Sequence, residues 1–584
     1  MKKLLVSILA LALLLGCVSA QAETAVPRLE DIDTSAVNID PANPLGPQFT
    51  GLYSFDVALE GGARQLYHYV PETLTYRQPA VAIGVPTGED ALAFAEATGW
   101  KALADEQGFS LILMLPGENG WADNDAEYVN GAFGYMDART WLQMQDSAFY
   151  MVGYGDSANS VMAHVLNNSE LLAGFAAFGV DNFDTALLDA AKAAPSALEG
   201  VSKAEVNIPA WFGANEKNAT VEALTAFWKN CNDVNESNAF SNAFADEIYI
   251  FRPELALDND MTDQNVAQVR VTLGLDKTTA PEFTNELWNS FLRRVRRQDS
   301  ETINGLRAFA TNEELGMERV TLEVNGVTRE MWIFQPTAVK NGLTNVPVVF
   351  VAHGGGGSGE EFNNRTGWSR VAEERNFVVV FMTGSRSNQK FKASTTWQLS
   401  DLDYWKAIRE YVLANYSMID ATRVYVTGHS MGDLMAHYIG LYTPELVAAI
   451  APNDALVIGG IDGLADPIVE NIVLPYMLNI GTLDYGFVPG GMNDGLTSRE
   501  VLRILARYGI TATEEETYQY QNGRYHGYVW TNHQGIPVAK EQWVDGKIHA
   551  MIPEECYTIY DFLANYSRGA DGTSYYMGVA IELQ

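Results

Sequence analysis

The sequence predicts an α/β protein made of two tandem units with the same kind of fold. Three observations carry this prediction: a length of 584 residues, an internal repeat, and apolar runs that alternate with helical patterns. A chain of this length exceeds what one ordinary hydrophobic core holds, so two domains are expected. Strands buried on both faces form continuous apolar runs, and their alternation with helices favours parallel sheets covered by helices on both sides.

Three blocks of sequence recur in the same order in the two halves of the chain. They pair residues 61–71 with 326–336, 98–114 with 366–382, and 155–164 with 428–437. Chance similarity would not preserve this order, so we expect a tandem duplication. The resulting layout is a linker over 23–45, a first unit over 46–300, a second linker over 301–317 and a second unit over 318–584.

The second unit shows the alternation of strands and helices most clearly. Apolar runs rich in β-branched residues predict strands at 346–351, 377–382, 423–427 and 474–480. Helical patterns predict helices near 366–374, over 402–415, from Met431 onward and from Pro553 to Asn565.

The composition, 47% hydrophobic and 19% charged, excludes disordered, collagenous and coiled-coil chains. The 73 acidic residues against 38 basic ones leave a formal charge of −35. Such an acidic surface repels phosphate backbones, so we expect no nucleic-acid partner. Three cysteines cannot form a disulfide framework, and Cys231 and Cys556 are expected to be free buried thiols.

The first 22 residues predict export. Met1–Lys3 is basic, Leu4–Leu15 is an apolar run too short to span a membrane comfortably, and Ala20–Ala22 fits a small-x-small cleavage site. Leu14–Cys17 resembles a bacterial lipobox, in which Cys17 would be lipidated. We therefore expect an extracellular or cell-surface protein whose only membrane association is an N-terminal lipid anchor; free secretion and anchoring both stay open.

A G-x-S-x-G motif, residues 428–432, lies directly between a predicted strand and a predicted helix. The motif alone is weak, but a strand–turn–helix setting exposes a strained serine hydroxyl, and small residues beside it avoid clashes. The N-terminus of the following helix also directs N–H groups at a developing oxyanion. Ser430 is therefore the predicted nucleophile, with a structural serine in a tight turn as the alternative.

A glycine-rich loop, His353 to Gly357, follows the predicted strand 346–351. In serine hydrolases a loop in this place supplies one oxyanion N–H, and the residue after the nucleophile supplies the other. The predicted donors are Met431 and either Gly355 or Gly356. A phosphate-binding loop is the alternative, but neither a G-K-[ST] nor a G-x-G-x-x-G context accompanies these glycines.

The expected order of a triad in this fold is serine, acid, histidine. His549 follows a turn and precedes a capped helix near the C-terminus, which makes it the predicted base. His526 and His533 are the alternatives. His437 lies two turns along the helix after Ser430 and is expected to pack against its surroundings.

The predicted acid is Asp484, which begins the loop after the strand 474–480. It would orient the imidazole of the base and stabilise the imidazolium cation. Asp454, Asp462 and Asp466 are weaker alternatives because they follow the helix of the serine too soon.

Four motifs in this order resemble the polyhydroxybutyrate depolymerase and feruloyl/acetylxylan esterase group of the α/β-hydrolase superfamily. They are HGGGGSGEEF at 353–362, TGHSMGD at 427–433, GTLDYGFVPGG at 481–491 and IHAMIPEE at 548–555. The resemblance covers most of residues 318–584 and implies an exported α/β-hydrolase with a triad of Ser430, Asp484 and His549. One departure is Asp433, where the group usually has a small residue; a charge there can blunt activity or alter substrate preference.

These observations predict an exported serine esterase that acts through an acyl-enzyme. The resemblance implies, as substrates, feruloyl or acetyl esters of plant polysaccharide or a short hydroxyalkanoate polyester. Trp397 and His429 are expected to contact substrate, with core packing as the alternative for Trp397. An acyltransferase of the same fold and a non-catalytic polymer-binding lipoprotein are the alternative functions. The chain has no sequence spacing typical of a metal site, so no metal and no cofactor are expected.

The first unit is expected to be a degenerate, non-catalytic copy of the second. Ser157 matches the nucleophile in the aligned blocks, but Asn159 replaces the final glycine of the motif. Pro86, in the loop that matches the oxyanion loop, has no N–H to donate. Lys277 lies near the position of His549, and a lysine of ordinary pKa is protonated and cannot act as the base.

Overall fold

The computed structural model describes residues 26–36, 44–75, 78–122, 125–138, 142, 144–197, 201–251, 265–298, 305–386, 395–455, 472–484, 501, 504–506 and 517–582. The predicted signal peptide and lipobox, residues 1–22, lie outside the described residues. Asp462 and Asp466 do so as well. Within the described ranges, no helix is long and apolar enough to cross a bilayer. Cys231 and Cys556 are free and buried, as predicted.

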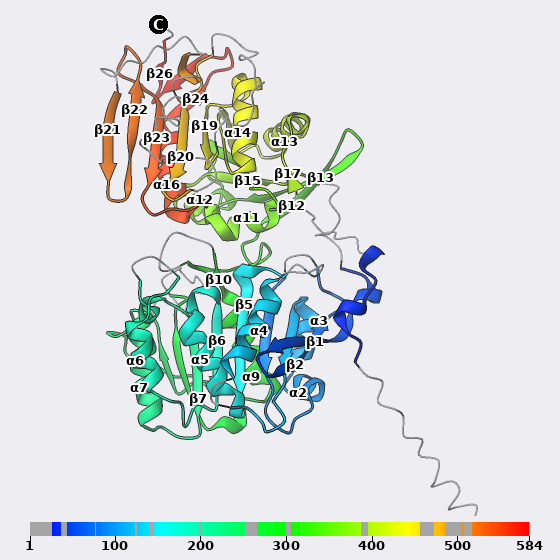
Figure 1. The fold of residues 1–584 in the computed structure, drawn as a ribbon. Helices are drawn as coiled ribbons and strands as arrows, with labels where there is room; N and C mark the ends of the chain where they lie inside the picture. The colour runs from blue at the N-terminus through cyan, green and yellow to red at the C-terminus, as the bar shows by residue number, and fades with distance from the viewer. Residues whose placement is uncertain are drawn as a thin grey trace, which may run out of the picture.

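The first unit is a nine-stranded sheet with helices packed against it (Figure 1). Its strands are β1 Gly51–Leu59, β2 Gly62–Val70, β3 Ala80–Gly84, β4 Ser110–Met114, β5 Phe149–Tyr154, β6 Gly174–Phe178, β7 Ala210–Ala214, β8 Glu247–Tyr249 and β9 Val269–Leu273. Its helices are α2 Ala91–Ala97, α3 Trp100–Gln107, α4 Ala126–Asp137, α5 Ala158–Asn168, α6 Ala186–Ala193, α7 Ala219–Cys231 and α9 Pro281–Asn289.

The second unit is a ten-stranded sheet with its own helices (Figure 1). Its strands are β12 Glu318–Val324, β13 Val327–Phe334, β14 Val346–Ala352, β15 Val378–Met382, β18 Ile419–His429, β19 Ala449–Asn453, β20 Tyr476–Gly481, β21 Thr517–Asn522, β22 Tyr525–Thr531 and β23 Pro537–Val544. Its helices are α10 Thr337–Lys340, α11 Gly359–Thr366, α12 Trp368–Arg375, α13 Leu402–Asn415, α14 Met431–Tyr442 and α16 Pro553–Leu563. Two small sheets complete it: β16 Ser385–Arg386 with β17 Thr395–Thr396, and β24 Tyr566–Arg568 with β25 Ser574–Tyr576 and β26 Val579–Ala580.

Both sheets follow the same strand order over eight strands: β1-β2-β4-β3-β5-β6-β7-β9 in the first and β12-β13-β15-β14-β18-β19-β20-β23 in the second. In each, an antiparallel hairpin leads into a parallel central region. The predicted α/β class is therefore confirmed, but both sheets are mixed: their centres are parallel as expected, and strands at both edges pair antiparallel.

The central strands are buried on both faces, which explains their continuous apolar sequence. In β3, Val81 and Ile83 belong to one apolar cluster, whereas Ala80 and Ala82 belong to another on the opposite face of the sheet. Every residue of β14 and β15 is buried. A strand enclosed by helices in this way needs apolar side chains at every position.

The paired blocks of sequence make paired contacts. Arg64 in the first unit lies over the ring of Tyr128, with the guanidinium carbon 4.0 Å from the ring centroid. Arg329 in the second unit lies over the ring of Tyr404, also at 4.0 Å. The two arginines were matched in sequence and make equivalent contacts in the structure.

The described parts of the two predicted linkers, residues 26–36, 44–45 and 305–317, contact the rest of the chain. In 23–45, Leu29 is buried, and the backbone N–H of Ser54 donates to Pro27 O over 2.8 Å. In 301–317, strand β11 (Leu306–Ala308) pairs with β10 (Val295–Arg297) in a hairpin. Buried apolar side chains, Leu29 and Leu306, explain why the described parts of these two segments pack against the rest of the chain.

Candidate active site

Ser430 lies at the sharp turn between strand β18 and helix α14, as predicted. Its backbone has φ 57° and ψ −114°, a strained conformation for a residue with a side chain. The turn is tight: a Cβ on Gly428 would collide with Gly432 O, and one on Gly432 would collide with Ala352 O. The two glycines of the motif are therefore required by close backbone approach.

The predicted acid and base are in contact. Nδ1 of His549 lies 2.9 Å from Oδ2 of Asp484. Asp484 is only 3% exposed, whereas the His549 side chain keeps 19% of its surface. A carboxylate can only accept, so Nδ1 carries the proton and donates, which leaves Nε2 with the lone pair that a general base needs.

The elbow and the loop of His549 are adjacent. The ring of His429, the residue before Ser430, lies 4.7 Å from the ring of His549 between centroids. The His429 side chain is mostly buried, and burial lowers its pKa well below 6.5, with His549 and Lys547 acting in the same direction. His429 is thus neutral at physiological pH.

The alternative histidines interact with other carboxylates. His526 Nε2 lies 3.2 Å from Asp545, and His533 Nε2 lies 3.3 Å from Glu582. His437 lies on α14 and is fully buried, with its Nε2 2.9 Å from the hydroxyl of Tyr476 at the start of β20. The packing role predicted for His437 agrees with this position.

Asp433, the departure from the resembled group, is held by its surroundings. It is fully buried, with Oδ1 2.7 Å from His437 Nδ1. Its Oδ2 accepts the backbone N–H of Ala455 over 3.2 Å. The Asp433 carboxylate therefore contacts His437 on its own helix and the backbone of Ala455, which follows strand β19.

The glycine-rich loop lies against the elbow. A Cβ on Gly354 would be 3.6 Å from Ser430 Cβ, and a Cβ on Gly355 would be 3.3 Å from Met431 Cγ. The loop predicted to supply an oxyanion donor is therefore next to the predicted nucleophile and to Met431, the other predicted donor.

The side chain of His353 fixes one peptide of this loop. The backbone N–H of Gly384 donates to His353 Nε2 over 2.9 Å, so Nε2 is unprotonated and Nδ1 carries the hydrogen. Nδ1 donates to Gly354 O over 2.6 Å. Because C=O and N–H point in opposite directions across a trans peptide, the N–H of Gly355 points away from His353.

Trp397, predicted to contact substrate, is a core residue. It is 2% exposed and donates its indole N–H to His353 O over 2.8 Å. Through this bond Trp397 packs against the glycine-rich loop, so the core-packing alternative holds for this residue.

Strand register identifies the residue of the first unit that occupies the elbow. The pairing of neighbouring strands can be traced in each unit from the methionine that ends the matched block, Met114 or Met382, across the central strands. In the first unit it runs from Met114 to Gly84 to Gly153, and in the second from Met382 to Ala352 to Gly428. Two residues later come Gly155 and Ser430, which share a positive φ of 55° and 57°.

The predicted equivalence of Ser157 with Ser430 is therefore wrong. A short 3₁₀ turn, Gly155–Ser157, precedes helix α5, whereas α14 begins directly after Ser430. This turn carries Ser157 past the elbow into the interior, where it is fully buried. Its hydroxyl accepts the N–H of Tyr154 over 2.9 Å and lies 2.9 Å from Gly84 O.

Two other residues of the first unit complete the comparison. Trp121 donates its indole N–H to Val85 O over 2.7 Å, as Trp397 does to His353 O. Lys277, expected near the position of the base, has a 37% exposed side chain 3.3 Å from Asp246.

A buried charged cluster beside the site was not predicted. Lys547 Nζ lies 2.8 Å from Asp454 Oδ2 and 2.8 Å from Glu555 Oε1, and all three side chains are fully buried. Asp454 was considered only as an alternative acid. The available signal was that a lysine and a glutamate flank His549, but sequence alone does not show that they turn inward.

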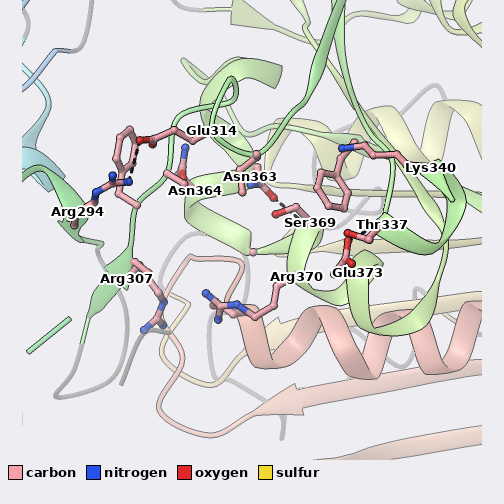
Figure 2. Close-up of a pocket in the computed structure, with 17 residues that line it drawn as sticks. Arg294, Arg307, Glu314, Thr337, Lys340, Asn363, Asn364, Ser369, Arg370 and Glu373 are labelled. Atoms are coloured by element: carbon pink, nitrogen blue, oxygen red, sulfur yellow. Dashed lines mark hydrogen bonds and ion pairs between the residues drawn. The ribbon is translucent and has the colours of Figure 1, made fainter. Parts of the chain in front are cut away.

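The cavity in Figure 2 is separate from the predicted triad and from the Lys547 cluster. Its volume is about 580 Å³, and it lies between the β10–β11 hairpin and helices α11 and α12. Arg294, Arg307, Lys340 and Arg370 are among its lining residues, together with Phe309. None of the predicted triad residues lines it.

No family model matches the chain. Feruloyl esterase B from Talaromyces funiculosus is 27% identical over 150 residues, which cover 24% of this chain and 41% of that protein. The bifunctional acetylxylan esterase/xylanase XynS20E from Neocallimastix patriciarum is 26% identical over 130 residues, covering 22% of this chain and 18% of that protein. The chain thus spans less than half the length of these curated relatives.

Among solved structures, an acetyl xylan esterase from Aspergillus awamori matches with a TM-score of 0.32 and 15% identity, covering 42% of this chain and 99% of that one. The sequence relatives are the informative comparison. Over about a quarter of its length, the chain is related in sequence to the feruloyl and acetylxylan esterases.

Proposed function

We propose that the second unit is a serine esterase that hydrolyses carboxylic esters. The observation that carries the proposal is the contact of His549 with buried Asp484 beside a strained elbow that presents Ser430. Related esterases over part of the chain support the same reaction class.

In the proposed reaction, the Ser430 hydroxyl oxygen attacks the ester carbonyl carbon while His549 Nε2 takes its proton. The N–H groups of Met431 and Gly355 stabilise the oxyanion of the tetrahedral intermediate. The intermediate collapses as His549 returns the proton to the leaving alcohol, which leaves an acyl-enzyme. Water, deprotonated by His549, then attacks the acyl carbon, and the acid leaves as Ser430 regains its proton.

Between the two glycines left open by the sequence, we propose Gly355 as the donor. The hydrogen bond from His353 Nδ1 holds the carbonyl of Gly354, and therefore sets the direction of the next N–H. Asp484 keeps the imidazole in the required tautomer and stabilises its cation during both proton transfers.

The proposed substrates are feruloyl or acetyl esters of plant polysaccharide, or a short hydroxyalkanoate polyester. The names of the relatives, feruloyl esterase and acetylxylan esterase, support the first two. Substrates of this kind are outside the cell, in agreement with the expected export.

We also propose that the two units arose by tandem duplication and that the first is non-catalytic. Shared strand order and paired arginine contacts support the duplication. At the elbow position the first unit has Gly155, which carries no nucleophile, and Ser157 is bonded within the interior.

A fluorophosphonate probe followed by peptide mapping tests this proposal. We expect label on Ser430 alone, because among the serines that the structure describes it is the one at a strand–helix elbow next to the proposed base. Ser430→Ala should abolish both labelling and ester hydrolysis, whereas Ser157→Ala should leave both unchanged. Absence of label in the folded protein would refute the esterase, and a label at Ser157 would refute the non-catalytic first unit.

A further inference from the structure

The buried cluster of Lys547, Asp454 and Glu555 is an unusual feature to find inside a hydrophobic core. Removing one ammonium and two carboxylates from water is unfavourable, and such groups often contribute less stability than apolar side chains of the same size. Burial raises the pKa of Asp454 well above 3.8, with Glu555 and Asp484 adding to the rise and Lys547 opposing it. The contacts of this cluster therefore indicate a role other than stability.

Asp454 connects the cluster to the nucleophile. It directly follows Asn453, whose carbonyl accepts the backbone N–H of Ser430 over 2.9 Å. Its own Oδ2 lies 3.6 Å from Nε2 of His429, the residue before Ser430. Ser430 and the residue before it thus both lie against the end of strand β19 and the residue that follows this strand.

The same cluster connects to the acid and the base. Asp454 Oδ1 accepts the backbone N–H of Gly481, which begins the loop that carries Asp484, over 3.2 Å. Lys547 precedes His549 by two residues, and its carbonyl accepts the N–H of Leu483 over 3.0 Å.

Gly481 permits this junction. A Cβ on it would collide with Lys547 O, so only glycine lets the two loops approach this closely. The three segments that carry the proposed triad therefore meet around one ion pair.

We propose that Asp454 and Lys547 are positioning residues that hold Asp484 and His549 in register with Ser430. The inference rests on the proposed esterase function. In the first unit, the register places Gly179 at the position of Asp454, since its N–H donates to Gly213 O as that of Asp454 does to Asn479 O. The first unit thus has no side chain at this position, and the N–H equivalent to that of Gly481, on Asn215, donates instead to Asp181 Oδ1 over 2.9 Å.

The test is Asp454→Asn, which keeps the shape and an oxygen for the Gly481 N–H, removes the charge, and leaves Lys547 paired with Glu555. We expect kcat to fall roughly 10- to 100-fold with KM changed less than about twofold, because misplacement of catalytic groups acts on the reaction step. Asp420→Asn is the matched control: Asp420 pairs with Arg423 Nε at 2.7 Å near the other end of β18. It should retain wild-type kcat.

A second readout does not need turnover. In protein labelled with ¹⁵N-histidine, the hydrogen-bonded Nδ1 proton of His549 should give a downfield resonance that His549→Gln identifies. Asp454→Asn should shift or remove this resonance, and Asp420→Asn should keep it. If Asp454→Asn does not fold, Lys547→Arg, which keeps the charge and moves it, should show the same losses.

The outcomes separate the two proposals. If the wild-type protein shows the His549 resonance but neither hydrolyses esters nor takes up the fluorophosphonate label, the esterase is refuted. The positioning role is then decided by the resonance of Asp454→Asn. Wild-type kcat and an unchanged resonance in the folded variant would overturn the positioning role. So would an equal loss of kcat in Asp420→Asn.

Discussion

At Ser430 the backbone adopts a conformation that residues with a side chain avoid, with φ 57° and ψ −114°. Such a conformation costs about 1–3 kcal/mol and persists only when the surrounding structure enforces it. Here the enforcement comes from the turn glycines and from the bond of Ser430 N–H to Asn453 O. The strained turn places Ser430 directly before α14, the position that the proposed nucleophile occupies.

The strain predicts a difference between two inactive variants. Ser430→Gly and Ser430→Ala both remove the nucleophile, so both should be inactive. Only glycine adopts this φ without strain, so Ser430→Gly should be more resistant to unfolding than Ser430→Ala by about 1 kcal/mol. Urea denaturation of the two variants measures the difference. Equal midpoints, or a more stable alanine variant, would contradict the strain.

At the scale of elements, periodicity predicts much of the second unit. Helix α13 has the predicted bounds, and α14 begins at the predicted Met431. Helix α12 begins at Trp368 because Gly367 takes a left-handed conformation and separates it from α11. Local rules capture such features because each depends on neighbouring residues alone.

Features that depend on distant contacts were missed or misplaced. The 3₁₀ turn before α5 shifted the first-unit elbow by two residues, which sequence matching by Ser157 could not reveal. The proposed triad of Ser430, Asp484 and His549 was suggested by motif and chain order. The cluster around Lys547 was not, because its three charges come from separate segments and pair only in the folded core.

The loop from His353 to Gly357 gives a prediction at this scale. His353→Ala removes one of two donors to Gly354 O, the other being the N–H of Gly357 over 3.1 Å, and so loosens the direction of the Gly355 N–H. We expect kcat to fall roughly 10- to 100-fold, below the 100- to 1,000-fold effect of deleting an oxyanion donor outright, with KM little changed. Steady-state kinetics on a chromogenic acetate ester measure this.

The control for His353→Ala is His533→Ala, which removes a partly exposed histidine paired with Glu582. It should keep wild-type kcat. If His353→Ala also keeps wild-type kcat, the loop holds its shape without the imidazole, and the positioning of Gly355 must come from elsewhere.

At the scale of the whole molecule, the chain contains two sheets with the same strand order. Its formal charge is −35. A charge of this size repels anions at long range and weakens their encounter with a cleft. Polysaccharides that bear uronate groups would be repelled, whereas neutral esters would not. Salt shortens the range of this repulsion from roughly 10 Å at 0.1 M to roughly 3 Å at 1 M.

This predicts a salt dependence that differs between substrates. KM for an acetylated polysaccharide rich in uronate should fall as sodium chloride is raised, because screening removes the repulsion. KM for a small neutral acetate ester should stay constant and serves as the control. A KM for the anionic polymer that is insensitive to salt would show that the surface charge does not reach the cleft.

In the first unit, Gly155 keeps the backbone bend of the elbow but has no side chain that could act as a nucleophile. A mutation of this position to serine would restore the strain without supplying a base, because the two histidines of the first unit, His68 and His164, are buried and bonded to Tyr135 and Asn130. Each intermediate step back towards chemistry would therefore be less stable and no more active. Under the proposed duplication, the first unit would therefore need several substitutions together to gain esterase chemistry, and no single substitution would suffice.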